Sequence, residues 1–67
     1  MNIYEAAQKL KLYRYIKRKD WEGFIYVSGN NILLYKYPQS KKIIEFTLRL
    51  NDLLADDWEV VNLSEYR

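Results

Sequence analysis

The chain contains neither cysteine nor histidine, and this limits the ways in which its 67 residues can form a stable fold. A domain of this length hides only about 60% of the surface that its unfolded chain exposes, so its core is thin. Disulfides and structural zinc, which stabilise many very small domains, both depend on these residue types. We therefore expect a single domain over residues 1–67 that self-associates as a homo-oligomer, with no metal site and no cofactor.

Aromatic residues make up 16% of the chain, with seven Tyr, two Trp and two Phe. An interior this small does not enclose so many rings. Surplus aromatic surface is typical of an interface or a ligand site.

Hydropathy and charge limit the partners. The longest apolar run is far too short to span a bilayer, and Glu5 and Gln8 interrupt the segment where a signal peptide is apolar, so we expect a cytoplasmic protein with no membrane partner. The net charge of +2 is too weak to indicate general nucleic-acid binding. The charge is uneven, because Lys11–Lys19 holds five cations and no acid, whereas five acids follow Asn51. Such a field attracts a small anion to one side of the molecule.

Two segments have the features of helices. Asn2 and Glu5 have the spacing of a capping box, and the apolar stripe behind them predicts a helix over residues 3–9 or 3–11. Asn51 is placed to cap a second, single helical turn over 52–56 or 52–57, where an early aspartate suits the helix dipole.

Segments with period-two alternation or strand-like composition, bounded by turn residues, predict five strands: 12–18, 24–28, 32–37, 42–50 and 58–61. Gly23 supplies conformational freedom to the first turn, Ser28–Asn31 predicts a hairpin, and a second turn follows at Pro38–Lys41. The alternation in the fourth strand assigns four residues to the core: Ile44, Phe46, Leu48 and Leu50. The element order predicts an α+β domain with a small, mostly antiparallel sheet of four to five strands, an N-terminal helix and a short helical turn before the last strand. Residues 62–67 are predicted to be a polar tail that frays.

The segment Lys17–Gly23 places a guanidinium, two ammonium groups and an indole within a few residues of one another. Indole rings stack on nucleobases, and Arg binds phosphate oxygens through two parallel hydrogen bonds. The segment therefore predicts half of a nucleotide pocket, with Lys17, Arg18 and Trp21 as ligand-binding residues. A structural alternative stays open, in which Trp21 only fastens the turn to the core and the cations are solvated.

Two motifs resemble those of the phage Thoeris anti-defence two family. Residues 18–23 are similar to the Arg-x-x-Trp-x-Gly motif near the start of these proteins, and residues 52–61 are similar to their C-terminal signature, Asp-x-Leu-Ala-x-Asp-Trp-x-Val. The opening Tyr4–Ala7 resembles the family's aromatic-x-Glu-Ala helix. The resemblance covers most of the chain except its middle.

The resemblance implies a sponge protein. Such proteins form dimers or tetramers and trap, without cleaving them, cyclic ADP-ribose-type signals and related cyclic nucleotides made by bacterial immune systems. Carried over to this sequence, Trp21 stacks on a base, Arg18 lies beside it near phosphate, and Asp52 takes hydrogen bonds from ribose or base. The burial usual for large aromatics favours a core role for Trp58, and Asp57 is expected to cap or pair rather than touch ligand.

The middle of the chain departs from the family pattern. Family members carry a longer segment there that often ends in Pro-Trp, and Phe46 stands about where that Trp aligns. Phe46 is therefore a candidate second stacking residue, although its place in the apolar register of the fourth strand favours core packing.

The residues give little support to catalysis, and we predict no enzyme. The three serines have no base beside them in turns or tail, and Asp56 and Asp57 diverge by about 100° on a helical turn. Two alternatives to the sponge remain open. One is a protein-binding inhibitor whose Tyr-rich surface covers a host enzyme. The other is a small nucleic-acid-binding module that uses four residues of a sheet face: Tyr13, Tyr15, Lys17 and Lys36.

Overall fold

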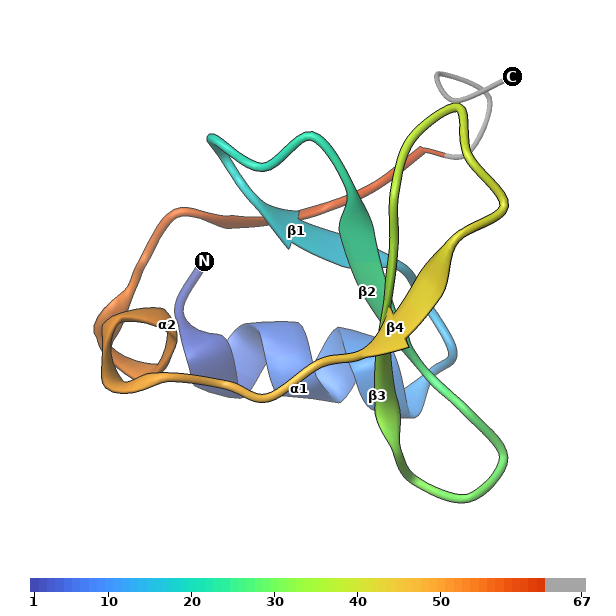
Figure 1. Cartoon of the computed structure of the whole chain (residues 1–67). Helices are drawn as coiled ribbons and strands as arrows, with labels where there is room; N and C mark the ends of the chain where they lie inside the picture. The colour runs from blue at the N-terminus through green and yellow to red at the C-terminus, as the bar shows by residue number, and fades with distance from the viewer. Residues whose placement is uncertain (63–67) are drawn as a thin grey trace.

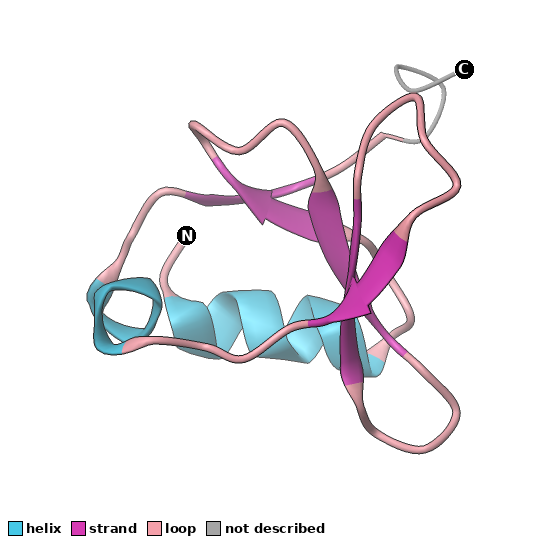
Figure 2. Ribbon diagram, in the orientation of Figure 1, coloured by secondary structure: helices cyan, strands magenta, loops and turns pink. Residues whose placement is uncertain are grey.

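The computed structural model describes residues 1–62, and its elements follow the predicted order (Figures 1 and 2). The helices are α1 (Ile3–Lys11) and α2 (Leu50–Leu54). The strands are β1 (Ile16–Arg18), β2 (Phe24–Val27), β3 (Leu33–Lys36), β4 (Ile43–Glu45) and β5 (Trp58–Val60). They form one antiparallel sheet in the order β4-β3-β2-β1-β5, so the predicted fold class is confirmed. Residues 63–67 of the predicted tail lie outside the described part.

Helix α1 forms because its first turn is capped reciprocally. The Glu5 amide donates to Oδ1 of Asn2 over 2.9 Å, and the Asn2 amide donates to Oε1 of Glu5 over 3.1 Å. The predicted capping box is confirmed. Of the four residues predicted to form the apolar stripe, Ala6 and Leu10 are buried and Ile3 packs against the core, whereas Ala7 is exposed. The helix lies against one face of the sheet, where it contacts β1, β2 and β5 (Figure 1). No helix among residues 1–62 is long and apolar enough to cross a membrane.

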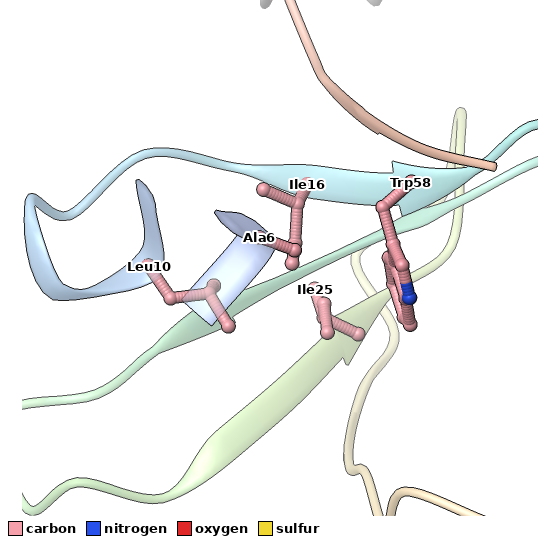
Figure 3. Close-up of a cluster of buried hydrophobic side chains, with 5 residues drawn as sticks. All are labelled: Ala6, Leu10, Ile16, Ile25 and Trp58. Carbon is pink, nitrogen blue, oxygen red and sulfur yellow. The ribbon is translucent and has the colours of Figure 1, made fainter. Parts of the chain in front are cut away.

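The core is a small cluster between α1 and the sheet (Figure 3): Ala6, Leu10, Ile16, Ile25 and Trp58. Ile16 and Ile25 face each other across the β1–β2 ladder and are fully buried. Trp58 is 2% exposed, which confirms its predicted role in the core. Its Nε1–H donates to the carbonyl of Asp52 over 3.1 Å, so the only polar atom of the indole is satisfied.

The predicted first strand began too early. Residues 12–15 instead end α1 in a turn in which Tyr13 has a φ of 60°, in the left-handed region. The Tyr13 amide donates to the carbonyl of Leu10, and the Arg14 amide donates to that of Lys9, the two hydrogen bonds of a Schellman motif. Polar and apolar residues alternate in this segment, but the termination of α1 determines its backbone conformation.

The predicted fourth strand was too long. Strand β4 ends at Glu45, and the chain then leaves the sheet toward α2. Of the four residues assigned to the core, Phe46 and Leu48 pack against it, whereas Ile44 is 39% exposed and Leu50 is 68% exposed. The core assignment was wrong for Ile44, because it lies on the edge strand, and for Leu50, because it begins a helix.

The cap of α2 also differs from the prediction. Asn51 lies inside the helix, and Arg49 holds the N-cap position. The Arg49 amide donates to Oδ2 of Asp52 over 3.0 Å, which satisfies this backbone group. Asp52 in the first turn thus supplies the side-chain contact at this helix start, although it binds the amide of the N-cap residue and does not act as the N-cap predicted at Asn51.

The predicted hairpin between β2 and β3 is confirmed, with Val27 opposite Leu33 next to the turn. Asn31 has a φ of 61° and so supplies the left-handed residue that the turn needs. The hydroxyl of Ser28 accepts hydrogen bonds from the amides of Asn30 and Ile32, which closes the turn.

Candidate functional site

Arg18 joins the two sequence motifs. Its Nε lies 2.9 Å from Oδ1 of Asp57, and its Nη1 lies 3.2 Å from Oδ1 of Asp52. Alternation along β1 places Arg18 on the same face as Ile16, which is the face that α1 covers. The guanidinium is therefore held by two carboxylates of the C-terminal motif.

Arg18, Asp52 and Asp57 form a triad of charged side chains that stabilise one another. The hydrogen bond from Arg18 holds the pKa of the Asp57 carboxyl below its usual range, and Asp57 in turn raises the pKa of Arg18. Asp52 is only 8% exposed. One of its carboxylate oxygens accepts from Arg18 and the other accepts from the Arg49 amide, so Asp52 fixes the start of α2 against β1.

Trp21 is the aromatic centre of the site. Its ring meets those of Tyr35, Phe46 and Trp58 edge to face, at centroid distances of 5.6, 5.2 and 5.2 Å. The side chain is partly buried and packs against the core. Trp21 of the first motif therefore contacts Trp58 of the second, just as Arg18 of the first contacts Asp52 and Asp57 of the second.

Gly23 is required for close approach rather than for an unusual φ. A Cβ at this position would lie 2.3 Å from the carbonyl oxygen of Lys36 and 2.6 Å from the ring of Tyr35. The absence of a side chain lets the Gly23 amide donate to the Tyr35 hydroxyl over 2.9 Å. The expected conformational freedom is not used, since Gly23 has no positive φ. The glycine of the motif thus fixes the ring of Tyr35 beside Trp21.

An open cleft of about 500 Å³ lies beside this aromatic cluster. Trp21, Tyr35 and Phe46 provide rings to its wall, and Arg49 provides a cation. The other lining residues are Ile44, Glu45, Thr47 and Asp52. Both motifs and the chain before α2 thus contribute to one concave surface.

This arrangement of the two motifs agrees with the comparison of the whole sequence. Residues 1–61 match the Thoeris anti-defense 2-like domain. The chain belongs to this family. The match confirms the resemblance seen in the motifs and extends it through the middle of the chain. None of the curated proteins matches the sequence.

Three of the predicted site residues of this Thoeris anti-defense 2-like domain line the cleft: Trp21, Phe46 and Asp52. Arg18 does not line the cleft, but it binds Asp52, which does, and Asp57. Trp21 and Phe46 also pack against the core, so the same rings serve the fold and the cleft wall.

Lys17 lies away from the cleft. Because side chains alternate along β1, Lys17 points to the face opposite Arg18. Its Nζ donates to Oε1 of Glu59 and to the carbonyl of Lys19, each over 3.1 Å. The cation that a ligand in the cleft would meet is Arg49 instead.

Sequence reasoning missed two cleft residues of this anti-defense domain, Tyr35 and Arg49. Tyr35 follows Leu33 at strand spacing, and that spacing could have placed both on the core face. Arg49 directly precedes the helix that carries the C-terminal motif, but no local pattern shows that it faces Trp21. Among residues 1–62, the Arg49 side chain has no hydrogen bond and no ion pair.

Proposed function

We propose that this domain is a sponge that binds a cyclic ADP-ribose-type or cyclic oligonucleotide immune signal in the cleft and keeps it from its effector without cleaving it. The proposal rests on one observation: three aromatic rings lie on the same concave surface as Arg49, a cation whose side chain has no ion pair among residues 1–62. Rings stack on bases, and a guanidinium binds phosphate oxygens.

The dimensions of the cleft fit a nucleotide. Small-molecule sites occupy about 300–1,000 Å³, and this cleft has about 500 Å³. A stacked base contributes about 1–3 kcal/mol, and a charge-assisted hydrogen bond contributes about 1.5–3 kcal/mol. The loss of rigid-body freedom opposes these terms by about 4 kcal/mol or more. One cleft with one cation therefore binds weakly, and we propose that a homodimer or homotetramer completes the site.

The chemistry of the cleft supports retention rather than hydrolysis. The chain has no histidine or cysteine to act as base or nucleophile. Of the two acids that line the cleft, Asp52 is held by Arg18, and Glu45 stands on the edge strand. The domain would act in the cytoplasm of an infected bacterium, where such signals are made.

The proposal is tested by calorimetric titration of the protein with cyclic ADP-ribose isomers and cyclic dinucleotides, followed by mass spectrometry of the ligand after heat release. We expect one class of ligand to bind and to be recovered with unchanged mass. A recovered hydrolysis product would overturn the sponge. Absence of binding by every ligand, together with co-purification of a host protein, would favour the protein-binding inhibitor.

A control separates the cleft from other aromatic surface. Tyr15 packs edge to face with Phe24 and Tyr26 at 5.1 and 5.5 Å, in a cluster that does not line the cleft. Phe46→Ala should weaken binding by about ten-fold or more, since about 1.4 kcal/mol corresponds to a factor of ten. Tyr15→Ala should leave the affinity unchanged. Equal losses in both variants would place the ligand elsewhere.

A further inference from the structure

Helix α2 turns its apolar side toward solvent. Leu50, Leu53 and Leu54 are 68%, 46% and 74% exposed, whereas Asp52 between them is 8% exposed. The three leucines stand at i, i+3 and i+4, which places them on one face of the helix. A surface helix normally shows the reverse arrangement, with leucines inward and the carboxylate outward. We call these three residues the leucine face.

The inversion follows from the triad. Arg18 and the Arg49 amide hold the Asp52 carboxylate inward, so the opposite side of α2 must face away from the protein. The leucine face is thus fixed in its orientation by buried charge rather than by loose packing. Exposed apolar patches of this kind are typical of contact surfaces.

The charges at the two ends of the leucine face indicate what covers it. Arg49 precedes the face and Asp56 follows it, and both are exposed. Within the described residues, neither side chain has a hydrogen bond or an ion pair. If two copies pair their α2 helices antiparallel, leucines meet leucines, and Arg49 of each copy meets Asp56 of the other. The surface is therefore complementary to itself, as a two-fold interface requires.

We propose that the leucine face of α2 is the contact between two copies of this chain, fastened at both ends by Arg49 of one copy and Asp56 of the other. The contact also reaches the cleft, because Arg49 lines it. Arg18 shows in this protein that one guanidinium serves two acceptors at once. Arg49 can likewise bind Asp56 of the second copy and present its remaining N–H groups to a phosphate. This last step alone rests on the proposed function.

The contact is tested by sedimentation equilibrium of the full chain without nucleotide. We expect a dimer, and we expect Leu50→Glu to weaken it by about ten-fold or more, because a charge replaces a leucine that the dimer would bury. Leu12→Glu is the matched control, since Leu12 is 67% exposed and Leu50 is 68% exposed. The control should remain dimeric. A monomeric wild type, or equal effects of the two variants, would overturn the proposal.

Charge reversal tests the orientation. Arg49→Asp and Asp56→Arg should each weaken the dimer, and the double variant should restore it, because the exchanged charges again meet across the interface. A double variant as weak as the singles would refute the antiparallel pairing. Circular dichroism confirms that each variant is folded. Since these measurements contain no nucleotide, failure of nucleotide binding by an intact dimer would count against the proposed function and not against the interface.

Discussion

The Nε atom of Arg18 lies 2.9 Å from Oδ1 of Asp57, although 39 residues separate the two in sequence. This ion pair connects the third residue of β1 to the residue before β5, and the Lys19 amide donates to the Asp57 carbonyl beside it. The N-terminal and C-terminal motifs are therefore parts of one structural unit. The cleft forms where that unit meets β3 and the chain before α2.

The ion pair predicts how stability depends on pH. Arg18 lowers the pKa of Asp57 in the folded protein, so the pair stabilises the fold above the ordinary Asp pKa of about 4 and is lost as the pH falls through the lower, folded value. We expect the thermal midpoint to fall below about pH 4. Asp57→Asn should lower the midpoint at pH 7 and flatten the acid limb, which is the fall of the midpoint as the pH decreases. Asp20→Asn, at an exposed residue, is the control, and an acid limb in Asp57→Asn as steep as in the wild type would contradict the prediction.

Gly23→Ala should destabilise the fold, whereas Gly29→Ala should not. The new Cβ at Gly23 would meet the Lys36 carbonyl oxygen at 2.3 Å, but at Gly29 it would have nothing within 4 Å. Overpacking of this kind costs about 1–3 kcal/mol. Urea denaturation of both variants measures the difference in the free energy of unfolding. Equal values would show that the backbone around Gly23 moves aside.

Trp21→Ala should abolish binding of a cyclic nucleotide, because the ring forms part of the cleft wall. The substitution should also lower stability, by about 3–5 kcal/mol at most for a large aromatic, since Trp21 packs against the core. Titration at a temperature where circular dichroism shows a folded variant separates the two effects. The oligomer should persist; its loss together with folding would return Trp21 to a purely structural role.

Removal of the Arg49 side chain should mainly affect nucleotide affinity, whereas removal of the Arg18 side chain should mainly affect stability. Arg49→Ala should lower nucleotide affinity by about ten-fold or more and should lower the thermal midpoint less than Arg18→Ala does, since its side chain has no partner among residues 1–62. Arg18→Ala should mainly lower the midpoint, because it leaves Asp52 without its cation. Lys17→Ala should leave the affinity unchanged. If Lys17→Ala weakened binding more than Arg49→Ala, the ligand would lie on the opposite face of the sheet.

Local signals were sufficient for much of the fold. The capping box at Asn2 and the turn at Ser28–Asn31 each depend on neighbours a few residues away, and both were predicted correctly. Tyr13 and Leu50 were assigned wrongly because the end of α1 and the start of α2 override the alternation around them. Alternation shows which side chains share a face, but it does not show where a strand ends.

The candidate site was predictable in part. Trp21 was a candidate because it lies in a motif, and Phe46 because it stands about where a family tryptophan aligns; both line the cleft. The pairing of Arg18 with Asp52 was not foreseen, since it depends on a contact across 34 residues. Tyr35 was missed for the same reason, because its place beside Trp21 is set by the close approach of β3 to Gly23. Sequence motifs identified the surfaces that meet, and the tertiary structure decided which side chains remain available to a ligand.

The contact between the two indoles, 5.2 Å from centroid to centroid, has a practical consequence. They are the only tryptophans in the chain. One of them borders the cleft and the other is enclosed by the core, so their combined fluorescence comes from a single location. Emission from the unlabelled protein should therefore report both occupancy of the cleft and loss of the fold. A cyclic nucleotide bound in the cleft should quench or shift the spectrum while the protein is still folded.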